Sequence, residues 1–159
     1  MKGFIDSIQI NTGLIKLPII RDGENVGEIV FNPNDALLAE KFYQVAERLE
    51  VGGKELEKRA AEIDARTKAQ DNGLVSNRQE IIDFLRETHT YMCEQYDYLF
   101  GEGTSNKVFG DFVPITEFGL AVHDQFVNGF KPYFAKTRSE KIAKYTTAAS
   151  AKRNKRKRK

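Results

Sequence analysis

Apolar residues recur every three or four positions along much of this chain, a spacing that predicts amphipathic helices. The first helix is expected after the cluster Asn32-Pro33-Asn34-Asp35, whose residue types begin helices. We expect Gly52-Gly53 to interrupt it as a hinge, followed by a largely solvated helix. The apolar face before the hinge consists of Leu38, Phe42, Val45 and Leu49.

Two further apolar helices are predicted in the second half of the chain. One begins within Ser76-Asn77 and is rich in aromatic residues, so we expect it to form the centre of the core. The other begins near Thr116. Gly129 and Pro132 should kink or break it near Phe134, because Pro132 cannot donate a helical hydrogen bond. A polar helix is expected over residues 135–144.

Residues 5–31 have a different pattern, in which apolar and polar residues alternate and predict β-strands. The alternation includes Ile8 and Ile10, and the Asp22-Gly23 pair between two β-branched runs predicts a hairpin turn. Pro18 has no N–H, so its strand is expected at a sheet edge. A meander of two or three strands cannot stand alone, and its apolar face must pack on the helices.

These elements predict an α+β fold that is mainly α. An N-terminal β-hairpin or meander packs on a bundle of about four to five helices, and a basic C-terminal tail follows. We expect a single domain over residues 1–146, with the β-meander at 1–31 and the helices at 33–146. Residues 147–159 form the basic tail.

Charge sets the end of the chain apart. Residues 151–159 hold seven of the 25 Lys and Arg residues and none of the 23 Asp and Glu residues. The formal charge of +2 therefore divides into +7 on this segment and −5 on residues 1–150, which have 18 basic and 23 acidic groups. The charged tail consists of Lys152, Arg153, Lys155, Arg156, Lys157, Arg158 and Lys159.

Such a run is either a disordered, solubilising tail or an arm for nucleic acid or an acidic protein surface. It has no interleaved aromatic residues for base stacking, so we expect no sequence-specific recognition. No run of about eighteen apolar residues is present, and no membrane span is expected. Asp6 and the lack of an extended apolar run argue against a signal peptide. The single cysteine, Cys93, fits a reducing cytoplasm.

Residues suited to catalysis or metal binding are few. His89 and Cys93 are four residues apart on a predicted helix and could share a metal ion, with His123 as the only other strong ligand. A zinc site needs more ligands, so a partly buried His and a structural Cys are the simpler interpretation. Neither His lies near a motif such as Gly-x-Ser-x-Gly. We expect no catalytic residue, no metal and no cofactor, and a protein that is not an enzyme.

The most distinctive segment is a glycine-rich corner, Phe100-Gly101-Glu102-Gly103-Thr104-Ser105-Asn106-Lys107-Val108-Phe109-Gly110. Gly101 stands where a helix end needs a residue with positive φ. Thr104 or Ser105 is expected to cap a short turn that ends at Gly110. A phosphate-binding loop is not predicted, because Asn106 rather than a glycine stands directly before Lys107, Val108 rather than Ser or Thr stands directly after it, and no strand leads into the corner.

Aromatic residues concentrate around this corner. Large aromatic side chains are usually buried, so we expect most of them in the core, and any that are exposed would suit a partner interface. The candidate partner-binding residues are Phe100, Lys107, Phe109 and Phe112.

The corner also carries a family resemblance. Phe-Gly-Glu-Gly-Thr-x-x-Lys-Val-Phe-Gly, after one helix and before a second that ends in a basic tail, resembles the tail assembly chaperones of long-tailed bacteriophages, of the type with Gram-positive hosts. The resemblance covers roughly residues 84–159. It extends more loosely to the strand-rich start, which runs into Asn32-Pro33-Asn34-Asp35 and a helix with Phe42-Tyr43.

The resemblance implies a non-catalytic chaperone that binds the tape measure protein and helps the tail tube assemble. The resemblance also suggests the tail tube protein as a further partner. A homo-oligomer is compatible with the resemblance. It also implies a protein of the host cell cytoplasm that is absent from the mature virion. The alternative is a nucleic-acid-associated protein that uses its basic arm for non-specific binding.

Overall fold

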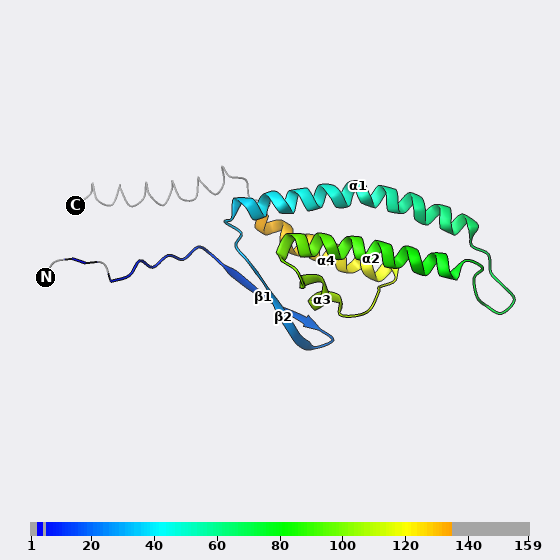
Figure 1. Cartoon of the computed structure of the whole chain (residues 1–159), viewed down its shortest axis with the longest axis horizontal. Helices are drawn as coiled ribbons and strands as arrows, with labels where there is room; N and C mark the ends of the chain where they lie inside the picture. Colours follow the sequence, from blue (N-terminus) through cyan, green and yellow to red (C-terminus); the bar gives the residue numbers. More distant parts are fainter. Residues whose placement is uncertain (1–2, 5, 135–159) are drawn as a thin grey trace. The chain divides into compact units, whose positions relative to one another are not determined.

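The computed structural model describes residues 3–4 and 6–134 (Figure 1). The polar helix expected over residues 135–144 and the basic tail over 147–159 lie outside the described residues. The elements, in chain order, are β1 (Ile15–Arg21), β2 (Glu24–Phe31), α1 (Ala36–Arg66), α2 (Arg78–Phe100), α3 (Thr104–Phe109) and α4 (Thr116–Phe134). The predicted α+β, mainly α fold with an N-terminal hairpin is confirmed.

The chain divides into two compact units, residues 1–120 and residues 121–159, and the break falls inside α4. The first unit contains the hairpin, α1, α2 and α3. The single domain expected over residues 1–146 stays a prediction.

β1 and β2 form a two-stranded antiparallel sheet, with Leu17 opposite Ile29. Asp22 and Gly23 have φ angles of 52° and 82°, as the central residues of a type I′ turn require, so the predicted hairpin turn is confirmed. The register shifts by one residue near Ile19, which marks a β-bulge. The inner face of the hairpin supplies two buried core residues, Ile29 and Phe31.

The predicted β structure does not reach the beginning of the chain. Residues 6–14 contain no strand, so the expectation of β structure there is wrong for the isolated chain. Ile8 and Ile10 do alternate with polar residues, but alternation makes a strand only where another strand accepts its backbone hydrogen bonds.

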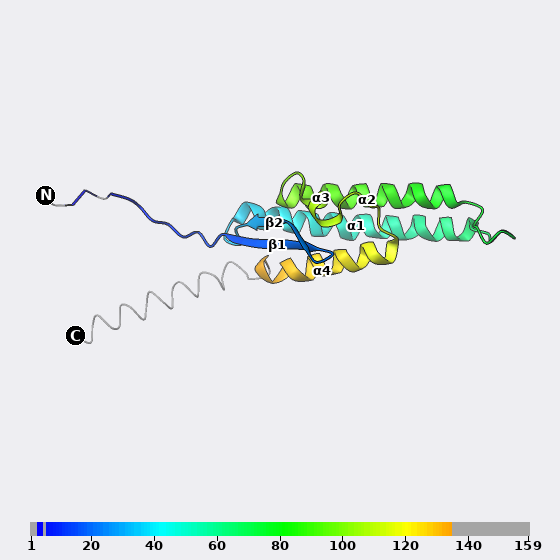
Figure 2. The same cartoon turned by 90° about the horizontal axis from the view of Figure 1, so that it is seen from below.

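α1 and α2 lie side by side and antiparallel (Figures 1 and 2), and α1 runs through Gly52 and Gly53 without a break. The predicted glycine hinge is therefore wrong. Tyr91 of α2 occupies the space beside Gly52, where a Cβ would lie 2.9 Å from the Tyr91 Oη. The Tyr91 hydroxyl also donates a 3.1 Å hydrogen bond to the carbonyl oxygen of Arg48. The glycine therefore allows the two helices to pack closely at this point.

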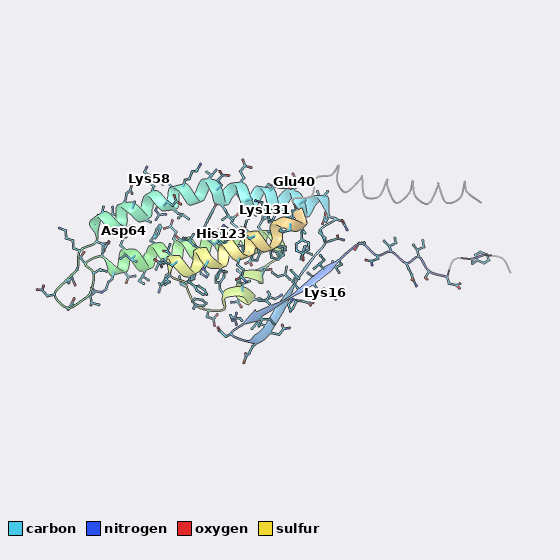
Figure 3. All side chains as sticks on the ribbon, turned by 180° about the vertical axis from the view of Figure 1, so that it is seen from behind. Lys16, Glu40, Lys58, Asp64, His123 and Lys131 are labelled. Atoms are coloured by element: carbon cyan, nitrogen blue, oxygen red, sulfur yellow. The ribbon has the colours of Figure 1, made fainter. Side chains whose placement is uncertain are left out.

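α2 contacts α1, α3 and β2, which confirms the prediction that it forms the centre of the core. Among the residues that the structure describes, Tyr96 of α2 is the most deeply buried large side chain, at 1% exposure. The opposite side of α1 is solvated: Glu40 and Lys58 project from α1 away from α2 (Figure 3). The buried apolar residues of the first unit are Ile29, Phe31, Phe42, Val45, Ile63, Phe84, Tyr96, Leu99 and Phe109.

α4 begins at Thr116, as predicted, and holds Pro132 near its last described residue, Phe134. Within α4 the rings of Phe126 and Phe130 lie 4.7 Å apart, and Phe130 and Phe134 are buried.

Candidate interaction site at the glycine-rich corner

The corner between α2 and α3 begins at Gly101. Its φ is 106°, which confirms the predicted positive φ, and its N–H donates a 2.8 Å hydrogen bond to the carbonyl oxygen of Asp97. A Cβ at Gly101 would have no heavy atom within 4 Å. The glycine is required by its backbone conformation alone, because the space beside it is open.

The start of α3 is capped differently from the prediction. Gly103 is the N-cap residue, and Thr104 and Ser105 are the first, buried residues of the helix. The prediction that Thr104 or Ser105 caps α3 is therefore wrong. The Asp97 carboxylate of α2 accepts a 2.8 Å hydrogen bond from the Ser105 N–H. The Thr104 hydroxyl donates a 2.8 Å bond back to the Gly101 carbonyl oxygen. A carboxylate at a helix N-terminus is stabilising because the first N–H groups have no partner inside the helix.

The other end of α3 is held by the hairpin. Arg21 of β1 donates hydrogen bonds of 3.1 and 2.9 Å to the carbonyl oxygens of Asn106 and Lys107. Gly110, with φ 67°, ends the helix as predicted, and a Cβ there would lie 3.1 Å from the Arg21 Cζ. The Asn106 carbonyl oxygen also accepts a 2.7 Å hydrogen bond from the Gly110 N–H, so the guanidinium group adds a charged donor at the end of the helix.

Lys107, a candidate partner-binding residue, packs on the hairpin. A Cβ at Gly27 of β2 would lie 2.9 Å from the Lys107 Cδ, so the aliphatic part of the lysine crosses the strand at this glycine. The residue as a whole is exposed. Its stem therefore helps to attach α3 to β2, as long cationic side chains commonly do on apolar surfaces.

Two of the aromatic candidates have structural contacts inside the protein. Phe109 is 4% exposed; its ring stacks on Tyr96 with centroids 6.1 Å apart, and His89 meets it edge-on at 4.9 Å. Phe100 is partly buried and packs against Phe31 of β2, with ring centroids 5.8 Å apart. Phe109 is covered in this structure, so it is a core residue that a partner does not reach.

The fourth candidate, Phe112, belongs to an exposed apolar patch. Phe112 is 49% exposed, and its ring lies 5.6 Å from that of Phe118. It also meets the buried Phe109, 6.5 Å away, so the core supports the patch from below. The other exposed residues of this patch were not among the predicted candidates. The sequence feature that could have indicated them is the run of apolar residues between Phe112 and Leu120. The 112–120 patch consists of Phe112, Val113, Ile115, Phe118 and Leu120, each 42% to 62% exposed.

His89 and Cys93 do lie together, with the Cys93 Sγ 3.4 Å from the His89 Nε2. Burial lowers the pKa of His89 and raises the pKa of Cys93, so both groups favour their neutral forms. A thiol held neutral in this way is a poor nucleophile. Among residues 3–4 and 6–134, no group of three or more His, Cys, Asp or Glu side chains is placed to hold a metal ion.

A groove of about 390 Å³ lies between α1 and α2 near their connected ends. Arg59 and Glu87 form a bidentate ion pair there, with both N–O distances 2.8 Å, and Arg66 pairs with Glu80. Hydrogen bonds from the two arginines hold the pKa of each glutamate below its usual range. Both arginines of the groove are thus engaged by carboxylates of the same chain.

The described residues therefore form a mainly helical α+β protein whose distinctive feature is a glycine-rich corner attached to a β-hairpin. The chain belongs to a family of unknown function, DUF6673, which it matches over residues 25–159. The search of curated proteins and the search of solved structures found no match. Within the described part of the chain, no helix is long and apolar enough to cross a membrane.

Proposed function

We propose that the protein is a non-catalytic bacteriophage tail assembly chaperone. It binds the tape measure protein in the host cytoplasm while the tail is built, and it is absent from the mature virion. The sequence of the corner, residues 100–110, supports this through its resemblance to such chaperones. The tail tube protein is a second candidate partner.

The structural observation that carries the proposal is the 112–120 patch. Its five large apolar residues are 42% to 62% exposed and follow directly after the corner. Exposed apolar side chains gathered in one short segment, with the rings of Phe112 and Phe118 in contact, are typical of a protein-binding site. The client that the resemblance implies is a long helical protein with apolar stripes, and such stripes need an apolar surface to cover them during assembly.

The proposal gives the residues of the corner and of the 112–120 patch two different roles, support of the patch and direct binding of the client. Phe109 is buried and contacts Phe112, so it positions the patch from inside. Lys107 attaches α3 to β2 through its contact at Gly27. Phe112 and Phe118 are exposed and bind the client directly. Phe100, which packs on Phe31, belongs with the supporting residues.

Co-expression with the tape measure protein of the same phage tests the proposal. Phe112→Ser combined with Phe118→Ser should weaken retention of soluble client by about tenfold or more, because exposed aromatic anchors commonly each contribute more than about 1 kcal/mol. The matched control is Leu37→Ser combined with Val51→Ser, which removes two apolar side chains that are 70% and 67% exposed on α1.

The control should hold the client as well as the unaltered chain does. Thermal melts of both double variants should match the unaltered chain, so that a loss of binding is not a loss of fold. The proposal is wrong if the patch variant keeps the client soluble as well as the control does.

The alternative is a nucleic-acid-associated protein, and the charge of the tail favours it. Residues 151–159 contain seven basic residues and no acidic ones. Deleting them changes the formal charge from +2 to −5. DNA and RNA titrations across salt concentrations should then show binding that falls steeply with salt and disappears on deletion, because counterion release dominates such contacts. No binding by the full chain at low salt would exclude the alternative.

A further inference from the structure

The chain begins with a segment that has the pattern of a strand but no partner strand. Ile8, Ile10 and Leu14 are 77%, 78% and 54% exposed. Ile8 and Ile10 occupy even-numbered positions, so they lie on one face where the backbone is extended. Gly13, with φ 86°, separates Leu14 from this run. In both Figure 1 and Figure 2 the segment leaves the start of β1 with no described strand beside it.

The base of this segment is fixed to the end of the hairpin. The Asn34 side chain donates a 2.9 Å hydrogen bond to the carbonyl oxygen of Thr12. Gly13 lies against the same amide, and a Cβ at Gly13 would be 2.7 Å from the Asn34 Nδ2. This contact sets the point at which residues 6–11 leave the hairpin.

β2 has an edge that can accept such a strand. The two-residue turn makes Arg21 and Glu24 a hydrogen-bonded pair, and counting through the bulge makes Pro18 and Glu28 a non-hydrogen-bonded pair. The N–H and C=O groups of Glu28, and likewise those of Val30, then point away from β1. Among the described residues, no backbone hydrogen bond from a turn, loop or helix cap reaches them.

The edge of β1 is less suitable, because Pro18 has no N–H to offer there. The outer face of the hairpin also carries exposed apolar side chains, Ile20 at 59% and Val30 at 43%. An added strand beside β2 would cover Val30 with its own isoleucines. Residues 6–11 are six residues, long enough to pair with most of the eight-residue β2.

The same molecule cannot supply this strand in antiparallel pairing. A strand antiparallel to β2 would run parallel to β1, and two parallel strands of one chain need a crossover connection of about a dozen residues. Only Thr12, Gly13 and Leu14 separate residue 11 from β1. A second copy of the chain has no such constraint.

We propose that residues 6–11 of one copy add as an antiparallel strand to the free edge of β2 in a second copy. Main-chain hydrogen bonds to Glu28 and Val30 give the affinity, and Ile8 and Ile10 are buried over the outer face of the hairpin. Every copy carries both the strand and the edge, so the contact builds either a closed pair or a larger assembly. The inference does not depend on the function proposed above.

Complementation between two variants tests it. The first lacks residues 1–11, which removes the strand but keeps the contact between Thr12 and Asn34. The second is Val30→Pro, which removes an outward N–H without removing a bond to β1. By size-exclusion chromatography with light scattering, the full chain should associate, each variant alone should be monomeric, and an equimolar mixture should form heterodimers.

Three further measurements keep the test decisive. Ile8→Lys with Ile10→Lys should also be monomeric, whereas the matched control Leu37→Lys with Val51→Lys should associate as the unaltered chain does. If Val30→Pro does not fold, hydrogen exchange decides: the Glu28 and Val30 amides should be protected in the full chain and should exchange at least about tenfold faster without residues 1–11. A full chain that is monomeric at every concentration, or a shortened chain that associates equally well, overturns the inference.

Discussion

Arg21 donates a 2.9 Å hydrogen bond to the carbonyl oxygen of Lys107, a residue 86 positions further along the chain. The same guanidinium nitrogen donates to the Asn106 carbonyl oxygen at 3.1 Å. One side chain of β1 therefore closes the C-terminal end of α3. The glycine-rich corner is attached to the hairpin at this point, and the corner in turn positions the 112–120 patch.

Arg21→Ala should lower the free energy of unfolding by about 1–3 kcal/mol, because two helix-end carbonyl oxygens lose a charged donor. Urea denaturation measures the change. Arg78→Ala is the matched control, since Arg78 is exposed at the first residue of α2, and it should shift the free energy by less than about 0.5 kcal/mol. Equal effects of the two variants would mean that Arg21 does not hold the corner.

Gly101→Val should destabilise the protein by about 1–3 kcal/mol, because a β-branched residue is strained at a φ of 106°. Thermal melts provide the measurement. Gly53→Ala is the opposite control: Gly53 lies inside α1 with open space beside it, so alanine should raise stability by about 0.5–1 kcal/mol. Unchanged melts for Gly101→Val would show that the corner tolerates another conformation.

Phe109→Ala and Phe112→Ala should differ in their effect on the free energy of unfolding. Phe109 is 4% exposed and Phe112 is 49% exposed. Removing the buried ring should cost about 3–5 kcal/mol in unfolding free energy, whereas removing the exposed ring should cost less than about 1 kcal/mol. Denaturant titration of both variants checks the difference. Similar losses would contradict the division between supporting and client-binding residues.

Stability should decrease as the pH falls from about 7.5 to about 5.5. Burial lowers the pKa of His89 and of His123, so the unfolded chain binds protons more readily than the folded one. The folded state is fully favoured above the histidine pKa of the unfolded chain, about 6.5, where both histidines are neutral in both states. This advantage is lost as the pH falls from about 6.5 towards the lower histidine pKa of the folded chain. Denaturation at the two pH values measures the slope, which should be smaller in His89→Gln. An unchanged slope in that variant would show that burial of His89 has no part in it.

Local backbone conformation could be read from the sequence at the corner, but the partners of its polar groups could not. A glycine at the end of an apolar helical pattern correctly predicted positive φ at Gly101, since the requirement lies in that residue alone. The cap of α3 was assigned to Thr104 or Ser105, whereas Asp97 provides it from the last turn of α2. Which carboxylate reaches an N–H depends on how two helices meet, and a sequence pattern does not contain that angle.

The sequence by itself determined three of the elements: a hairpin with its turn at Asp22-Gly23, a central aromatic helix, and a short turn between glycines, which is α3 in the structure. Those properties follow from the spacing of apolar residues and from backbone preferences, which act over a few neighbouring positions. Tertiary structure alone decided that Gly52 packs against Tyr91, that Phe109 is buried, and that Phe112 belongs to an exposed patch. Burial and close contact depend on residues far apart in the chain, so they are settled only when the elements pack together.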